Sequence, residues 1–183
     1  TEPVQPYLDQ ATILIEYFVA HGQIVVFIVT QDEIQAVKLE VQLSQIQQLL
    51  QLVWLNLRSV PRSSVKQQIQ SAGNMRSILR KLYKLLMFPI ENYLAPFANV
   101  IIVPHGPLHY LPFHALYVED APLLLQKEIS YLPSASFLRF CQEANHSGTE
   151  SIVLGNSYHG NLPNAVVEAQ NVATMLGSDP MIE

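Results

Sequence analysis

The chain has 183 residues, which is the size of about one domain. Hydrophobic residues make up 49% of it and charged residues only 14%, so a disordered polar chain is excluded and a packed core is expected. The formal net charge of −5 gives no reason to expect a nucleic-acid partner.

The first forty residues predict a small antiparallel β meander. Stretches rich in Ile, Val, Phe and Tyr at 12–19, 23–30 and 34–39 are separated by turns at His21-Gly22 and at Asp32. Short strands this close in sequence pair with their neighbours. We expect residues 1–40 to be a lead-in that extends or covers a sheet and carries no chemistry.

Residues 41–98 predict a helical segment. Apolar residues recur at three- and four-residue steps from Leu43 to Leu57, opposite a glutamine-rich face. After a looser stretch at 58–73, a second helix runs from Met75 and should end or kink at Pro89.

From Arg58 to Lys84 the charges of this segment are all positive. No acidic residue lies between Glu40 and Glu91, whereas seven of the ten Lys and Arg fall from Arg58 to Lys84. These charges indicate either a docking face for an acidic partner or nucleic acid, or a solvated helix face whose Lys and Arg stems cover apolar surface. We favour the solvated face, because Tyr83 is the only aromatic residue among these charges.

The rest of the chain is organised around the stretch VIIVPHGPLHYLPFHAL at 100–116. Its four β-branched residues, 100–103, predict a strand buried on both faces of a parallel sheet. Pro104, Gly106 and Pro107 then forbid both helix and strand. The apolar cluster that follows predicts a plug that folds back over the carboxyl edge of the sheet.

Residues 99–183 predict the amino-terminal part of an α/β core. Extended segments are expected at 123–126 and 128–132, followed by a helix through Phe137 and Cys141 and a loop at 147–149. A buried strand at 151–155, a long loop at 156–163, a helix at 164–176 that Gly177 caps and a strand from 180 follow. We expect strands 100–103 and 152–154 to share one sheet. The fold is expected to be incomplete at its carboxyl end.

Three histidines, His105, His109 and His114, lie close together but do not predict a metal site. Gly106 and the prolines at 107 and 112 break the helical spacing that a pair of ligands would need, and no Asp, Glu or Cys lies nearer than Glu119. We expect these imidazoles to hydrogen-bond backbone at a turn, one of them at the border of a pocket.

The single cysteine, Cys141, is not predicted to be a nucleophile. It lies near the end of its helix, where the negative end of the helix dipole disfavours a thiolate, so a small, semi-buried residue is expected. One cysteine excludes an internal disulfide and fits a reducing compartment, which favours the cytoplasm. No apolar run reaches the ~20 residues of a bilayer span, so no membrane partner is expected.

The loop GNSYHGNLP at 155–163 is the most site-like place in the sequence. It connects a buried strand to a helix, which puts it at the carboxyl edge of a sheet, where open α/β proteins bind ligands. Its glycines lack the G-x-G start of a dinucleotide fingerprint, and it has no Lys for a P-loop. A groove for an extended peptide suits the loop better, and no cofactor is expected.

Three motifs together resemble the CHAT domain. They are VIIVPHGPLHYLPFHAL, then ISYLPSASFL at 129–138, and IVLGNSYHGNLPNAVVEAQNVATML at 152–176, in the order and spacing of that family; the meander and the two helices also resemble its lead-in. The resemblance implies a caspase-like α/β fold, with a mostly parallel sheet flanked by helices. It also implies a cysteine endopeptidase with a His/Cys dyad, a protein or peptide substrate, and tetratricopeptide (TPR) repeats in the same or a partner chain.

The family's catalytic residues do not transfer to this sequence. The A-T-H-G-like and S-A-C-E-T-G-like motifs that carry the dyad do not occur here, so no catalytic residue is assigned. The resemblance implies a cleft lined by the loop after strand 152–155, which makes Asn156, His159, Asn161 and Asn164 substrate-binding candidates. Asn164 replaces the usual Gly. No Arg or Lys occurs in the loop, so a strict preference for aspartate is not supported.

Three functions remain open at this point. The first is the amino-terminal part of a CHAT cysteine endopeptidase whose dyad lies beyond residue 183, so that this chain alone is inactive. The second is a non-catalytic CHAT-like binding or regulatory module attached to TPR repeats. The third is an unrelated α/β domain that binds a small ligand.

Overall fold

The computed structural model describes residues 3–59, 64–143 and 151–183, and the predicted loop at 147–149 lies outside them. The chain divides into two compact units, Thr1–Gln142 and Glu143–Glu183, which are described separately below. The predicted segment boundaries at residues 40 and 98 both lie inside the first unit.

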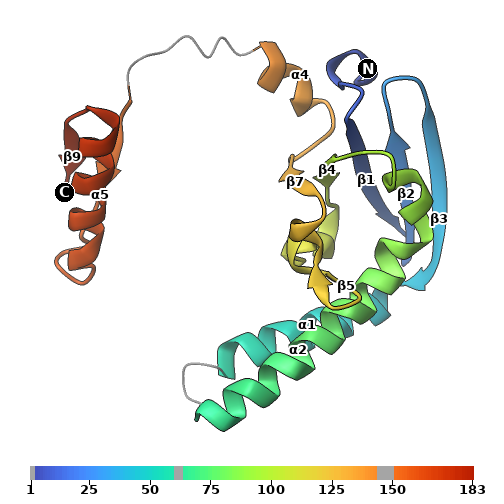
Figure 1. Cartoon of the computed structure of the whole chain (residues 1–183), viewed down its shortest axis with the longest axis horizontal. Helices are drawn as coiled ribbons and strands as arrows, with labels where there is room; N and C mark the ends of the chain where they lie inside the picture. The colour runs from blue at the N-terminus through green and yellow to red at the C-terminus, as the bar shows by residue number, and fades with distance from the viewer. Residues whose placement is uncertain (1–2, 60–63, 144–150) are drawn as a thin grey trace. The chain divides into compact units, whose positions relative to one another are not determined.

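The first unit is built on a five-stranded sheet of order β3-β2-β1-β4-β7 (Figure 1). Its strands are β1 (Thr12–Ala20), β2 (Gln23–Val29), β3 (Ile34–Gln42), β4 (Asn99–Val103) and β7 (Glu128–Tyr131). The meander β1–β3 is antiparallel, whereas β4 runs parallel to both β1 and β7. The meander is therefore a sheet extension, as predicted, and Ile15 pairs with both Ile28 and Ile102 across it.

Two long helices, α1 (Leu43–Ser59) and α2 (Val65–Leu86), pack on one face of this sheet. Helix α2 begins ten residues before the expected Met75. Ser64 and Gln67 form a capping box at its start, and the following residues include Lys66, Gln68 and Gln70, which favour helix even without an apolar stripe. Helix α2 ends before Pro89, which lies in a 3₁₀ turn, η3 (Phe88–Ile90), that leads into the short α3 (Glu91–Leu94).

The segment after β4 returns as the predicted apolar plug. It forms two 3₁₀ turns, η4 (Gly106–Tyr110) and η5 (Phe113–Ala115), and buries the side chains of Leu108, Leu111, Phe113 and Leu116 in the same core as α1 and α2. A small hairpin, β5 (Tyr117–Val118) and β6 (Ala121–Pro122), follows. The extended segment expected at 123–126 is wrong: Leu123–Leu125 forms a third 3₁₀ turn, η6, because the Leu123 carbonyl accepts the amides of Gln126 and Lys127.

The opposite face of the sheet carries a smaller hydrophobic cluster. The turn η1 (Gln5–Tyr7) and helix α4 (Phe137–Glu143) lie at this side and contribute few side chains. The buried members of this cluster are Leu8, Leu14, Val29, Ile101, Val103 and Leu138.

The second unit is a single strand–helix–strand motif. Strand β8 (Val153–Gly155) leads through a loop into α5 (Pro163–Leu176), and β9 (Pro180–Ile182) then pairs with β8 in parallel. Within the first unit β4 pairs with β1 and β7, and within the second unit β8 pairs with β9. The expectation that strands 100–103 and 152–154 share one sheet stays a prediction.

The α/β class and helices flanking a sheet that contains parallel strands are thus confirmed. None of the helices in the described ranges has the length and unbroken hydrophobicity that a bilayer crossing requires.

Candidate functional site

The loop from Asn156 to Leu162 leaves the end of β8 and enters α5. The strand can end so close to the helix only because residue 155 is glycine: a Cβ there would lie 2.6 Å from the Cβ of Ala169 and 3.4 Å from the carbonyl oxygen of Ala165. Small residues on α5 accept this approach, and Ala169 and Ala173 are buried with Val153. The loop therefore starts from a tightly fixed position.

Asn156 organises the first half of the loop. Its Oδ1 accepts the backbone N–H of Tyr158 at 2.6 Å, and its Nδ2 donates to the carboxylate of Glu183 at 3.3 Å. The backbone of β9 continues this pairing, since the Ser157 N–H donates to the Glu183 carbonyl at 2.9 Å. Both ends of the Asn156 amide are used within the fold, so this residue shapes the loop more readily than it could bind a ligand.

The tip of the loop is a left-handed turn. Tyr158, His159 and Gly160 have φ angles of 50°, 57° and 83°, a region that non-glycine residues seldom adopt. The turn is closed by two hydrogen bonds: the Gly160 N–H donates to Ser157 Oγ at 3.2 Å, and the Leu162 N–H donates to the Ser157 carbonyl at 2.8 Å. This backbone holds the side chain of His159 at the surface.

The four predicted substrate-binding residues are all exposed: Asn156, His159 and Asn161 lie in the loop, and Asn164 lies in the first turn of α5. His159 has its ring 6.0 Å from that of Tyr158, centroid to centroid. In residues 151–183 no hydrogen bond joins the side chains of Asn156, His159, Asn161 and Asn164 to one another. His159, Asn161 and Asn164 therefore offer separate donors and acceptors, and the role of all four residues in binding stays a prediction.

The charge around the loop is negative. Glu183 follows β9 at the same carboxyl edge, and residues 151–183 contain no Lys or Arg at all. A carboxylate ligand would meet no cation here, which extends the sequence argument against aspartate recognition from the loop to the whole second unit.

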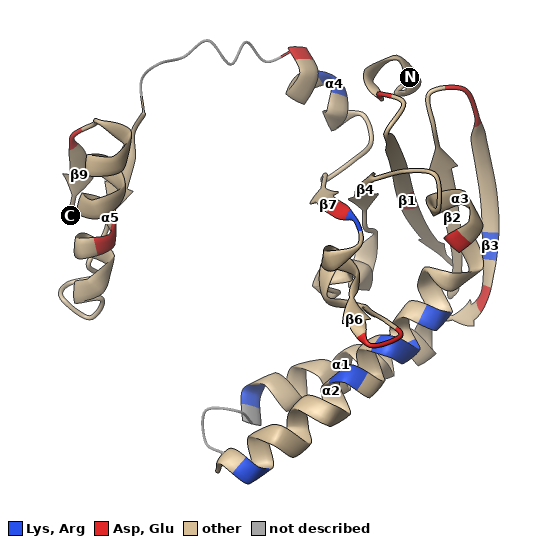
Figure 2. Cartoon of the chain, in the orientation of Figure 1, with Lys and Arg blue, Asp and Glu red and all other residues tan. Residues whose placement is uncertain are grey.

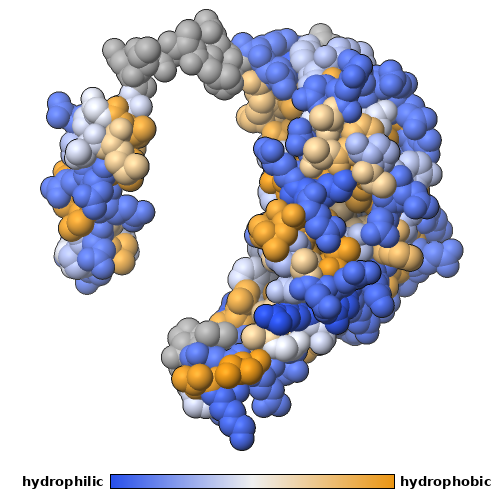
Figure 3. Space-filling view, viewed as in Figure 1, coloured by the Kyte–Doolittle hydropathy of each residue, from blue (hydrophilic) through white to orange (hydrophobic). Residues whose placement is uncertain are grey.

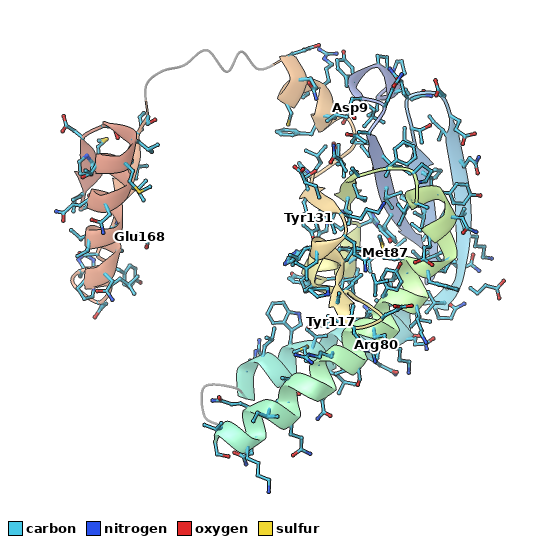
Figure 4. The ribbon with its side chains drawn as sticks, viewed as in Figure 1. Asp9, Arg80, Met87, Tyr117, Tyr131 and Glu168 are labelled. Carbon is cyan, nitrogen blue, oxygen red and sulfur yellow. The ribbon has the colours of Figure 1, made fainter. Side chains whose placement is uncertain are left out.

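Two histidines of the central stretch, His105 and His114, have structural contacts. His105 Nδ1 accepts the backbone N–H of Val19 at 3.1 Å, and its ring lies 5.1 Å from that of Phe18. His114 Nδ1 lies 2.9 Å from the hydroxyl of Tyr131, a residue labelled in Figure 4. No cluster of three or more metal-ligating side chains occurs in the part of the chain that the structure describes.

Cys141 lies in the second half of α4, as expected, but the prediction that it is semi-buried is wrong. Helix α4 has seven residues and buries only Leu138, so Cys141 faces solvent. A helix of about two turns that buries one side chain leaves most of its other side chains, including Cys141, in solvent.

A hollow that was not predicted from the sequence lies near the carboxyl ends of β4 and β7. It has a volume of about 480 Å³ and is lined by Glu16, Tyr7, Arg139, Phe140 and other residues around Ser134 and Ser136. Burial raises the pKa of the Glu16 carboxyl, and His105 opposes this by attraction. The sequence could have indicated this site, because Glu16 is the only charged residue in the otherwise largely apolar strand TILIEYFVA.

The chain matches a known protein family over more than half of its length. A family model described as the CHAT domain matches residues 76–181, from within α2 to β9. This chain belongs to the CHAT domain family. No curated protein matches it.

The match to the CHAT domain contains the plug after β4, the β8–α5 loop, all four predicted site residues, and both His105 and His114. The meander β1–β3 lies before the matched region, so its likeness to a CHAT lead-in stays a prediction. Because the meander shares a sheet with β4, it is nevertheless built into the same hydrophobic core as the CHAT segment.

Proposed function

We propose that this chain supplies the scaffold and one substrate-binding loop of a caspase-like cysteine endopeptidase of the CHAT family. The His/Cys dyad is assigned to residues beyond 183, so the chain alone has no proteolytic activity. The observation that carries this proposal is the family match over residues 76–181, which includes the β8–α5 loop.

The loop suits an extended peptide. Asn156 and Ser157 hold its backbone, while the exposed side chains of His159, Asn161 and Asn164 offer amide and imidazole groups that pair with peptide backbone. With no cation in residues 151–183, the favoured substrate side chain at this loop is neutral or basic.

A non-catalytic CHAT module attached to TPR repeats is the second candidate. Both candidates account equally for the structural roles of His105 and His114, and the residues that follow Glu183 in the gene separate them. Membership of the CHAT family removes the third reading, an unrelated ligand-binding domain. For both remaining candidates we infer a reducing compartment such as the cytoplasm.

The test compares the 183-residue chain with the same chain extended by the residues that follow it in the gene, on a library of fluorogenic peptides. We expect cleavage only by the extended protein, and we expect Cys141→Ser to leave it unchanged. In the extended protein, His159→Ala and Asn161→Ala should raise KM about threefold to tenfold with little change in kcat, because they remove binding made equally in ground and transition states.

Asn171→Ala, on the exposed side of α5 outside the loop, is the matched control and should leave KM unchanged. Cleavage by the 183-residue chain, or its loss in Cys141→Ser, would contradict the proposal. An extended protein that cleaves nothing would favour the binding module.

A further inference from the structure

Helix α1 leaves large apolar side chains exposed beside the stripe that faces the sheet. Ile46, Leu49 and Val53 are buried in the main core. The neighbouring face of the helix, where apolar and polar residues alternate, forms a groove of about 760 Å³ with the turn η4. Its lining consists of Gln47, Leu50, Gln51, Trp54, Leu55 and Arg58 from α1, and Pro107 and Tyr110 from η4.

The walls of this groove are large apolar side chains that the fold leaves in solvent. Trp54 is 42% exposed, Leu55 62% and Tyr110 66%, while Leu50 forms a buried floor. The space-filling view shows hydrophobic surface along the α1–α2 hairpin (Figure 3). Trp and Tyr around an apolar floor are the side chains that dominate the energy of protein interfaces.

The charge of the groove is positive and unbalanced. The α1–α2 hairpin carries Lys and Arg but no Asp or Glu, as Figure 2 shows. Two of these cations are already engaged: the Arg76 guanidinium lies 5.8 Å from the Tyr117 ring centroid, and Arg80 forms an ion pair with Asp120 at 3.1 Å. Arg58, which lines the groove, has no hydrogen bond or ion pair among the described residues.

We propose that this groove is a docking site for an amphipathic helix that carries acidic residues. The lining positions 47, 50, 51, 54, 55 and 58 follow the three- and four-residue steps of one helix face, and they span about 16 Å, or about three turns. A partner helix laid along this face would place its apolar residues against Trp54, Leu55 and Tyr110. Its Asp or Glu would then meet Arg58, an interaction that the surrounding cations favour.

Trp54 makes this proposal directly measurable, because it is the only tryptophan in the chain. The probes are three 14-residue peptides with Leu at one helix face: one with Glu on the flanks, one with Lys in place of Glu, and one with Glu and a central proline that prevents helix. We expect the Glu peptide to shift Trp54 emission to shorter wavelength and to bind at least about tenfold more tightly than the other two.

Two variants test the contacts. Arg58→Glu should lower the affinity for the Glu peptide at least about threefold and raise the affinity for the Lys peptide. Leu55→Asp should lower the affinity for both peptides. Lys38→Glu makes the same change of charge on an exposed position of β3 that does not line the groove, so it should alter neither affinity. Circular dichroism of each variant confirms that it is folded.

Three results would overturn the proposal: equal binding of the Glu and Lys peptides, an unchanged preference in Arg58→Glu, or the absence of any emission shift. Sedimentation provides a further check. A concentration-dependent dimer that Leu55→Asp abolishes would show that a second copy of the chain, and not an acidic helix, occupies the groove.

Discussion

At the scale of single residues, Tyr17 joins the sheet to the end of α2. It is 1% exposed, and its hydroxyl donates to the Leu86 carbonyl at 3.1 Å and lies 3.0 Å from Met87 Sδ. We expect Tyr17→Phe to lower the free energy of unfolding by about 1–2 kcal/mol, because the Leu86 carbonyl would lose a buried partner. Urea denaturation measures this, with Tyr110→Phe, which changes an exposed phenol, as the matched control.

The same tyrosine predicts a loss of stability in alkali. Burial raises the pKa of the Tyr17 hydroxyl above its usual value near 10, and burial, followed by the hydrogen bond and charge of Glu91, raises the pKa of Tyr83. A raised folded pKa stabilises the fold below the unfolded pKa, and this stability is lost as pH rises. The free energy of unfolding should therefore fall above about pH 10, by about 1.4 kcal/mol per unit for Tyr17. Tyr17→Phe should show a shallower fall, and an equal slope in both proteins would contradict the assignment.

Residue roles could be predicted where the sequence itself excludes an alternative. The breaks at Gly106 and the prolines favoured backbone hydrogen bonds for the histidines; His105 accepts one from Val19, whereas the ring of His114 pairs with the Tyr131 hydroxyl instead. Exposure was harder to predict. Cys141 was expected to be semi-buried, but the burial of a side chain on a seven-residue helix depends on what packs against it, which a single sequence does not specify.

At the scale of elements, Gly155 decides whether β8 and α5 can pack. We expect Gly155→Ala to disrupt this unit, because the new Cβ would lie 2.6 Å from the Cβ of Ala169. Hydrogen exchange of residues 151–183 should increase at least about tenfold, since an overpacked contact costs about 1–3 kcal/mol.

Ala169→Gly in the same chain removes the opposing Cβ and should restore part of the protection, although glycine in a helix costs about 1 kcal/mol. The double variant separates a local clash from a general effect of alanine at position 155. No recovery would mean that the strand, rather than the strand–helix contact, requires glycine.

Helices and strands with a clear periodic pattern of apolar residues were predictable, whereas elements set by local hydrogen bonds were not. The apolar stripe correctly predicted α1, and the alternation of turns and β-branched runs correctly predicted the meander. The first three turns of α2 have no such stripe and were missed, because their residues are exposed and only the Ser64–Gln67 capping box marks the start. The leucines at 123–125 read as extended, yet the carbonyl of Leu123 closes a 3₁₀ turn.

At the scale of the whole molecule, the α/β fold class was predictable from the sequence, but the pairing of strands far apart in the chain was not. The run 100–103 is buried and parallel to two neighbours, as its β-branched residues indicated. Which strands share a sheet depends on pairings between segments far apart in the chain. The apolar pattern of a strand does not identify its partner. The parallel pairing of β4 with β1 illustrates this, because no pattern in either strand indicated its partner.

The two compact units should differ in stability by a wide margin. In residues 151–183 the buried hydrophobic cluster consists of Val153, Ala169 and Ala173, whereas the first unit buries a far larger set around Ile15 and Ile102. A two-stranded sheet with so small a core is marginal by itself. We expect amides of β8 and α5 to show protection from hydrogen exchange at least about a hundredfold lower than those of β1 and β4. Equal protection in the two units would contradict this, because a core of two alanines and one valine supplies too little burial to account for it.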